Sequence, residues 1–242
     1  MMRISETVKH LVIINVIMFI GTIAIGEGVL FYDWFALYFP KNEAFQPWQI
    51  VTHMFMHGGA MHIFFNMFAL WMFGTPVEQT LGSKRFLFIY FSAGLGAVAL
   101  QLGYYYFKYI PMEQEAMALG FTQEQIVEVF KEGKVFRAIG QEFNEIYYAS
   151  MVGASGCIMG ILVAFGMMNP NAELMMIFLP IPIKAKYFIP GIIILDLISG
   201  ITGQSFFSPS NTAYMAHVGG ALAGFIIMWY WKKTQFNRNR WN

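Results

Sequence analysis

Apolar residues gather in six long stretches along this chain, and the segments between them carry most of the charged residues. A helix needs about 20 residues to cross the hydrocarbon layer of a bilayer, and each stretch is close to that length. The pattern therefore predicts an all-α polytopic membrane protein with a bundle of six transmembrane helices. The predicted spans are Val8–Leu30, Ala60–Val77, Phe86–Phe107, Val152–Met168, Tyr187–Gly203 and Thr212–Trp231.

The first stretch resembles a signal peptide in one respect, because Arg3 and Lys9 accompany it. The apolar region of a signal peptide usually spans about 7–15 residues, and this stretch is longer. We therefore expect an uncleaved first helix.

The composition agrees with a membrane location. Apolar residues make up 57% of the chain and charged residues 12%, against roughly 45–50% and 25% in ordinary soluble domains. The lipid bilayer is therefore the first expected partner. A net charge of +1 gives no electrostatic reason to expect a nucleic-acid partner. The single cysteine, Cys157, excludes an internal disulfide framework.

The basic residues predict how the chain threads the membrane. With six spans both termini lie on one side, and the side richer in Lys and Arg is usually cytoplasmic. Ten basic residues fall on the terminal side and five on the other. We therefore expect a multi-pass protein of a bacterial plasma membrane with both termini in the cytoplasm. The ten are Arg3, Lys9, Lys84, Arg85, Lys184, Lys186, Lys232, Lys233, Arg238 and Arg240, and the five are Lys41, Lys108, Lys131, Lys134 and Arg137.

The composition changes once, between the third and fourth predicted spans. Residues 108–146 hold seven of the fourteen acidic residues and form an acidic outer insertion in a single domain of residues 1–242. Inside the insertion, Thr122 and Gln125 have the spacing of a capping box, and an apolar stripe and Gly133 follow. The pattern predicts a short helix, which either lies at the outer membrane interface or packs on the protein.

Polar residues are rare inside the apolar stretches, and they mark functional sites because burying them in a membrane is costly. A group of four lies at the entrance to the second span, Ser155 opens the fourth span and His217 opens the sixth. All three spans enter from the outer side, so we expect these groups at a similar depth, where they can form one site. The four residues at the second span are His53, His57, His62 and Asn66.

Glycine pairs favour close contact between the fourth and sixth spans. The fourth span carries Gly156 and Gly160, and the sixth carries Gly220 and Gly224. Each pair forms a G-x-x-x-G, the pattern that lets the backbones of membrane helices approach closely. His217 lies on the same stripe as the glycines of its span. We therefore expect these two helices to abut.

A serine and a histidine on abutting helices suit nucleophilic acyl transfer, because neutral imidazole takes the hydroxyl proton as the oxygen attacks a carbonyl. No carboxylate stands in a matching position, so Ser155 and His217 are expected to act as a dyad. His62, Asn66 and the backbone N–H of Ser155 are donors of the kind that stabilise an oxyanion. We expect this site in a water-accessible cavity that opens to the outer face and is closed below by apolar side chains.

Three segments together resemble the signature segments of rhomboid intramembrane serine proteases. They are G-A-S-G at Gly153–Gly156, H-x3-H-x4-H-x3-N from His53 to Asn66, and A-H-x-x-G-x-x-x-G from Ala216 to Gly224. They occur in family order, and the resemblance covers nearly the whole chain. It implies a six-transmembrane-helix rhomboid-like bundle.

By this resemblance Ser155 is the nucleophile and His217 is the general base. The supporting residues are His62 and Asn66 as oxyanion donors, His57 and His53 behind the site, and Gly153 and Gly156 beside the nucleophile. The implied activity is hydrolysis of peptide bonds in or near transmembrane segments, with no metal and no cofactor. Membrane-protein substrates are then the second class of expected partner.

The chain differs from the family pattern at three positions. The first outer loop reads Trp48-Gln49 where the family often has Trp-Arg. Met159 stands where an aromatic residue often stacks on the histidine, and Thr212 stands where a glycine often begins the sixth-helix motif. These differences bear on loop anchoring and on the support of the base rather than on the chemistry.

Other interpretations of the same residues stay open. Taken alone, Ser155 is explained as a helix-contact residue. His53 and His57 have the spacing of a metal pair, but no cysteine or well-placed acidic residue joins them. Asp196, in the middle of the fifth span, could suggest a proton or ion path, but we expect a single buried carboxylate satisfied by a neighbouring Ser or Thr such as Ser199. The alternative function is a catalytically silent rhomboid-like protein that binds transmembrane helices; a transporter would need a hydrophilic path or an internal duplication, and neither is visible.

Overall fold

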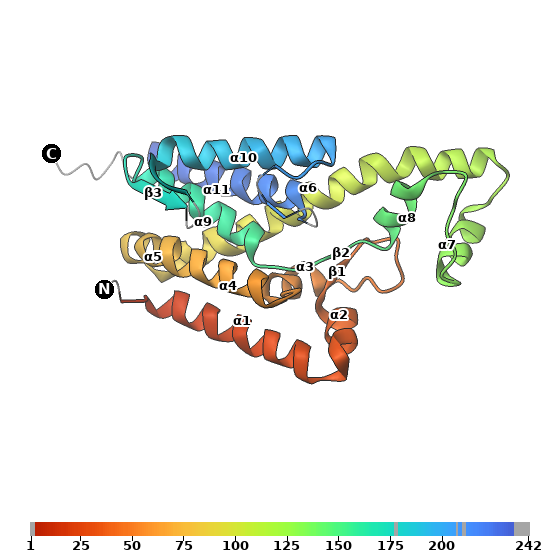
Figure 1. Cartoon of the computed structure of the whole chain (residues 1–242), viewed down its shortest axis with the longest axis horizontal. Helices are drawn as coiled ribbons and strands as arrows, with labels where there is room; N and C mark the ends of the chain where they lie inside the picture. Colours follow the sequence, from red (N-terminus) through yellow and green to blue (C-terminus); the bar gives the residue numbers. More distant parts are fainter. Residues whose placement is uncertain (1–2, 177–178, 207, 210–211, 235–242) are drawn as a thin grey trace.

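The computed structural model describes residues 3–176, 179–206, 208–209 and 212–234. They form a bundle of helices from which one long helix extends (Figure 1). The helices are α1 (Glu6–Ala24), α2 (Val29–Phe35), α3 (Gln49–Thr52), α4 (Ala60–Ala69), α5 (Thr75–Leu81), α6 (Ser83–Ala118), α7 (Gln123–Lys131), α8 (Gln141–Tyr147), α9 (Ser155–Met168), α10 (Ala185–Thr202) and α11 (Tyr214–Thr234). Short helical turns η1 (Gly26–Gly28), η2 (His53–Phe55) and η3 (Leu70–Gly74) adjoin α2, α3 and α4, in that order.

Several helices are built to cross a membrane. In the described part of the chain, four are long and apolar enough: α1, the continuous run Ala60–Leu81, α6 and α10. The shorter apolar helix α9 and the 21-residue α11 complete the six predicted segments. Large apolar side chains point outward along α1 and α10, which is typical of helices that face lipid. The chain is a multi-pass membrane protein, and the predicted helical fold class is confirmed.

Two predicted spans have the wrong bounds. The first was expected to reach Leu30, but α1 ends at Ala24, since Gly26 and Gly28 adopt φ values of 61° and 88° that no helix continues through. The third was expected to end at Phe107, but α6 continues to Ala118. At a rise of 1.5 Å per residue α6 is about 54 Å long, well beyond the roughly 30 Å of a hydrocarbon layer. Part of the predicted insertion is therefore helix α6.

The glycines of α9 and α11 let the two helices touch. A Cβ added at Gly220 would lie 2.0 Å from the Gly156 carbonyl oxygen, and one at Gly224 would lie 2.6 Å from Gly160 Cα. The two contacts have the same offset in residue number, so the helices run parallel and begin side by side. The predicted close contact is confirmed. It brings the starts of the two helices that carry Ser155 and His217 together.

Glu78 fastens α1 and α6 to α5. Its carboxylate accepts hydrogen bonds from the backbone N–H groups of Thr7 and Val8, both at 3.0 Å. The hydroxyls of Ser5 and Ser83 donate to it at 2.5 and 2.8 Å. One buried carboxylate thus caps the first turn of α1 and joins it to the side chain at the start of α6.

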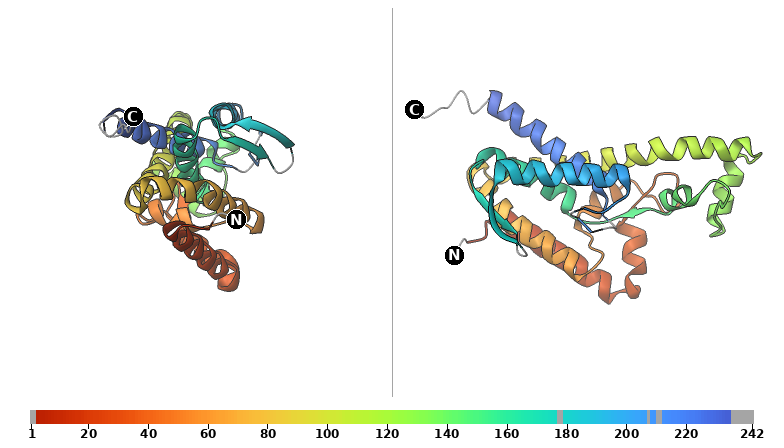
Figure 2. Two further views of the ribbon diagram at one scale, coloured as in Figure 1. Left: turned by 90° about the vertical axis from the view of Figure 1, so that its left-hand side faces the viewer. Right: turned by 45° about the horizontal axis from the view of Figure 1, so that its top comes forward.

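The start of α1 and the end of α11 lie at the same end of the bundle, which we call the terminal end (Figures 1 and 2). The starts of α9 and α11 lie toward the opposite end, which we call the site end. Two of the basic residues counted on the terminal side, Arg238 and Arg240, lie outside the described residues.

The insertion packs on the outer part of α6 through an aromatic cluster. Ile126 and Phe130 of α7 are buried there in one cluster with Phe39 and Phe143, and the rings of Phe130 and Phe143 lie 5.3 Å apart. The apolar stripe of α7 therefore faces protein, so packing on the protein, rather than lying at the membrane interface, is the correct interpretation of this helix. The predicted capping box at its start is confirmed, with Thr122 and Gln125 bonded reciprocally.

Ionic contacts join the same insertion to the first outer loop. Lys41 contacts Glu113 at 2.6 Å, and Lys131 contacts Glu43 at 2.5 Å. Two short antiparallel pairs complete the fold: β1 (Leu37–Tyr38) with β2 (Ser150–Met151), and β3 (Glu173–Met176) with β4 (Leu179–Lys184). The first pair matters for the site, because β2 leads directly into α9.

Candidate active site

Ser155 is the first residue of α9, and its side chain is half-buried. The chain reaches it through Gly153, which has a φ of 127° and whose N–H donates to the carbonyl of His53 at 2.9 Å. A positive φ of this size favours glycine. The turn before Ser155 is therefore fixed by a glycine conformation and by a hydrogen bond to the start of η2.

His62 and Asn66 of α4 lie against that glycine. A Cβ built on Gly153 would be 2.8 Å from His62 Nε2 and 3.7 Å from Asn66 Nδ2. Asn66 is buried, and within the described residues its Nδ2 has no hydrogen-bond partner. A buried amide donor without a partner is costly. The two side chains thus present nitrogen atoms to the backbone beside Ser155.

The hydrogen bond of His62 indicates which of its nitrogens carries the proton. The Gly58 N–H donates to His62 Nδ1 at 3.3 Å, so Nδ1 is an acceptor. In a neutral imidazole the proton then sits on Nε2. Nε2 is the atom beside Gly153, and it is therefore a donor there.

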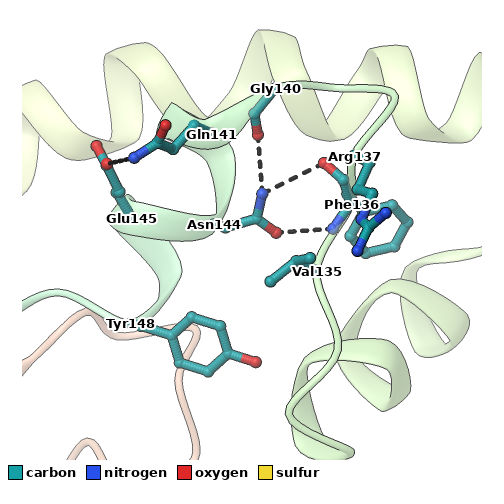
Figure 3. A pocket seen from close by; sticks show the side chains of 8 residues that line it. All are labelled: Val135, Phe136, Arg137, Gly140, Gln141, Asn144, Glu145 and Tyr148. Atoms are coloured by element: carbon teal, nitrogen blue, oxygen red, sulfur yellow. Dashed lines mark hydrogen bonds between the residues drawn. The ribbon is translucent and has the colours of Figure 1, made fainter.

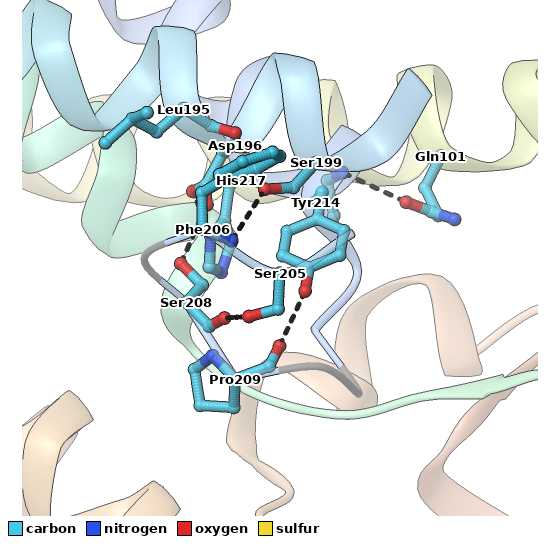
Figure 4. Close-up of polar contacts among 11 residues, drawn as sticks. Gln101, Leu195, Asp196, Ser199, Ser205, Phe206, Ser208, Pro209, Tyr214 and His217 are labelled. Atoms are coloured by element: carbon cyan, nitrogen blue, oxygen red, sulfur yellow. Dashed lines mark hydrogen bonds and ion pairs between the residues drawn. The ribbon is translucent and has the colours of Figure 1, made fainter. Parts of the chain in front are cut away.

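His217 lies near the start of α11, and its side chain is 12% exposed. Its Nδ1 is 2.7 Å from Oδ2 of Asp196 in α10 (Figure 4). The other carboxylate oxygen, Oδ1, accepts a hydrogen bond from the Ser208 hydroxyl at 2.7 Å. The side chain of Asp196 is only 2% exposed.

These contacts correct two expectations. A carboxylate does accompany the histidine, although none was expected in a matching position. Ser199 does not satisfy Asp196, because its hydroxyl donates to the carbonyl of Leu195 one turn back in the same helix. A serine in a helix commonly bonds to the carbonyl four residues earlier, and that local bond is available without any tertiary contact.

A sequence signal for Asp196 was present but incomplete. Asp196 lies six residues before the end of α10, and His217 lies three residues after the start of α11. The two helices meet at this end through the connection that contains Ser208. Asp196 and His217 therefore lie at the same depth on consecutive helices, and this equal depth is the sequence signal that they can pair. The position of Asp196 in the middle of its span does not by itself indicate a partner.

His53 and His57 lie behind the site, in and just after η2. His53 is buried, and its Nδ1 lies 2.7 Å from the Gln49 carbonyl oxygen. His57 is buried too, and its ring meets the His62 ring edge-on with centroids 5.0 Å apart. In the portion of the chain that is described, no three His, Cys, Asp or Glu side chains gather where they would hold a metal.

Gln49 braces the first outer loop from inside. It is fully buried, its amide nitrogen donates to the carbonyls of Asp33 and Ala44 at 3.0 and 2.9 Å, and its oxygen accepts from the Gln46 N–H at 3.0 Å. A glutamine at this position therefore links separate parts of the first outer loop through its side-chain hydrogen bonds. Met159 is buried in the apolar core of the bundle.

A separate cavity of about 480 Å³ lies in the insertion, between α8 and the segment before it (Figure 3). Asn144 crosses its edge, with hydrogen bonds to the backbone of Phe136 and Gly140. None of the residues predicted for the site lines this cavity. The lining residues are Val135, Phe136, Arg137, Gly140, Gln141, Asn144, Glu145 and Tyr148.

Fold and site define a helical, multi-pass membrane protein with a serine and a histidine on abutting helices. The rhomboid domain matches residues 44–234. The chain therefore belongs to the rhomboid family, and the resemblance read from its three sequence segments is confirmed.

Several relatives support this assignment. The chain is 29% identical to the presenilin-associated rhomboid-like protein, mitochondrial, of Rattus norvegicus and 30% identical to that of Homo sapiens, each over 198 residues. Each match covers 80% of this chain and 40% of the relative, so the chain spans about two fifths of their length. It is also 47% identical to the rhomboid protease GluP of Bacillus subtilis over 53 residues, 22% of this chain and 10% of that protein.

Proposed function

We propose that this chain is an intramembrane serine protease that hydrolyses peptide bonds in or near the transmembrane segments of membrane proteins. One observation carries the proposal: the nitrogens of His62 and Asn66 meet at Gly153, immediately before the helix that starts with Ser155. The unpartnered Asn66 amide is explained by an oxyanion that forms there only during the reaction.

The proposed reaction assigns each proton to an atom. His217 Nε2 takes the hydroxyl proton of Ser155 as Oγ bonds to the carbonyl carbon of the scissile peptide. The carbonyl oxygen becomes an oxyanion that accepts hydrogen bonds from His62 Nε2 and Asn66 Nδ2. The C–N bond then breaks, and His217 gives the proton to the leaving amine. Water next attacks the acyl-enzyme with His217 as base, which releases the carboxylic acid and restores Ser155.

The substrate class follows from the depth of the site. A helix hides its carbonyl groups in internal hydrogen bonds, and within a membrane it keeps them because no water replaces them. A nucleophile at the start of α9 therefore reaches peptide bonds only where a substrate helix unwinds. Preferred substrates are transmembrane segments with glycine, proline or other small residues near the site end of the bundle.

The orientation and the compartment belong to this proposal. We assign the terminal end of the bundle to the cytoplasmic side, because more of the basic residues lie there. We place the protein in a bacterial plasma membrane, whereas the rat and human relatives are named as mitochondrial. In a bacterial membrane the site end then faces outward.

Serine-reactive fluorophosphonate labelling tests the function and the orientation together. We expect a charged, membrane-impermeant probe to label wild-type protein in bacterial spheroplasts, and peptide mapping to place the label on Ser155. Purified protein in liposomes is expected to cleave substrate helices that carry glycine or proline near the site end. Labelling only after the membrane is opened would show that the site end faces the cytoplasm, opposite to the proposed orientation. If folded protein is neither labelled nor able to cleave a substrate, the silent, helix-binding alternative is favoured.

Gly153→Ala is expected to slow probe labelling of Ser155 by at least about tenfold. The added Cβ meets His62 Nε2 at 2.8 Å, and alanine is strained at a φ of 127°. Gly59→Ala is the matched control, because Gly59 has an extended φ of 171° and nothing within 4 Å of its Cβ position. The measurement is the second-order labelling rate in detergent. Equal rates for the two variants would show that the turn before Ser155 does not shape the site.

A further inference from the structure

Asp196 makes a contact that a two-residue mechanism does not need. It lies in α10, a helix that supplies no other residue to the site, and its buried side chain meets His217 Nδ1 at 2.7 Å. Burying a carboxylate is costly unless its oxygens find partners. Both oxygens are occupied, one by His217 and the other by the hydroxyl of Ser208 (Figure 4).

The arrangement orients the carboxylate from two sides. Ser208 lies in the connection between α10 and α11, and its hydroxyl donates to Oδ1, which leaves Oδ2 directed at the imidazole. The backbone of α11 is fixed nearby, because the Ala216 N–H donates to Gln101 Oε1 of α6 at 3.1 Å. Ser208 of the connection thus holds the carboxylate, and Gln101 of α6 holds the backbone beside the histidine.

We propose that Asp196 is a positioning residue for His217, so that the site works as a Ser155–His217–Asp196 triad rather than as a dyad. This inference rests on the proposed protease function and deepens it. Ser208 is the residue that holds Asp196 in place.

The role of Asp196 is electrostatic and orientational. An ionised carboxylate only accepts hydrogen bonds, so it keeps the His217 proton on Nδ1 and leaves the lone pair on Nε2. When His217 takes the Ser155 proton, the negative charge of Asp196 stabilises the imidazolium that forms. No proton passes to Asp196, which stays ionised throughout.

The two histidines of the site thus have opposite tautomers. His217 presents a bare Nε2 that accepts a proton, while His62 presents a protonated Nε2 that donates to the oxyanion. Among the described residues, Asp196 is the carboxylate that contacts His217.

The test compares Asp196→Asn with wild type in a liposome cleavage assay. Asparagine keeps the size and a hydrogen-bond acceptor but removes the charge. We expect kcat to fall about 10²- to 10⁴-fold with KM unchanged, and the labelling rate of Ser155 to fall in parallel. Ser199→Ala is the control: it deletes another buried hydroxyl of α10, which donates to the Leu195 carbonyl and accepts from the Phe206 N–H at 3.4 Å but does not contact His217, and it should leave kcat and KM unchanged.

The outcomes separate the two proposals. Wild-type protein that takes no probe overturns the protease function, and the role of Asp196 with it. Labelled wild type together with a folded Asp196→Asn variant of unchanged kcat overturns the triad alone. If Asp196→Asn does not fold, Ser208→Ala decides: a loss of kcat of about tenfold at constant KM supports the triad, and an unchanged kcat refutes it.

Discussion

Replacing Ser155 by alanine is expected to reduce substrate cleavage to background, and His217→Ala is expected to do the same. A hydroxyl is a poor nucleophile without a base, and the base has no task without the hydroxyl. Each residue therefore acts only through the other. Single losses in such pairs reach about 10⁴- to 10⁶-fold in kcat. Cleavage of a reconstituted transmembrane substrate, followed by mass spectrometry of the products, measures the effect.

The double variant gives the sharper result. Ser155→Ala/His217→Ala should be no worse than either single variant, because the second deletion removes nothing that still works. Ser155→Ala deletes a single oxygen from a half-buried position, so its unfolding midpoint should match that of wild type. If folded Ser155→Ala protein cleaves as fast as wild type, Ser155 is a helix-contact residue and the proposed function is wrong.

Gly220→Ala is expected to cause the largest loss of stability among single methyl additions in this bundle. The new Cβ would lie 2.0 Å from the Gly156 carbonyl oxygen and 2.8 Å from its carbonyl carbon, and backbone atoms cannot turn aside as a side chain does. The helices α9 and α11 must separate, at a cost of about 1–3 kcal/mol or more. The unfolding midpoint should fall by roughly 2–4 °C for each kcal/mol.

Gly103→Ala provides the control for this substitution. Gly103 is also a glycine inside a membrane helix, α6, but nothing lies within 4 Å of its Cβ position. Alanine favours helix over glycine by about 1 kcal/mol, so Gly103→Ala should be neutral or slightly stabilising. Thermal unfolding in the same detergent compares the two. A Gly220→Ala midpoint at or above that of Gly103→Ala would mean that the two helices do not abut as described.

The sequence was most informative where local rules dominate. Apolar length predicted the membrane helices because a bilayer accepts only segments whose backbone groups are satisfied internally. The G-x-x-x-G pairs predicted the contact of α9 with α11, and Thr122 and Gln125 predicted the cap of α7. The end of α6 escaped prediction. Its last turns carry Glu113, which is polar but is paired with Lys41 from a loop far away in the sequence.

The candidate site divides in the same way. Three short segments predicted the site residues Ser155, His217, His62 and Asn66, because each segment has its own spacing pattern. Asp196 belongs to no such pattern, and its partner is 21 residues away on another helix. Local spacing favoured Ser199 as the partner, but the hydroxyl of Ser199 was already used within its own helix.

The amino-acid sequence by itself determined the family, the membrane-spanning segments and the residues of the proposed serine–histidine pair, because these depend on composition and on spacing along the chain. The tertiary structure alone decided which groups meet: Asp196 with His217, His62 Nε2 with Gly153, and the apolar face of α7 with Phe143. Such contacts depend on how helices rotate and on where their ends fall. A buried polar group takes whichever partner that packing brings within about 3 Å, however distant it is in the sequence.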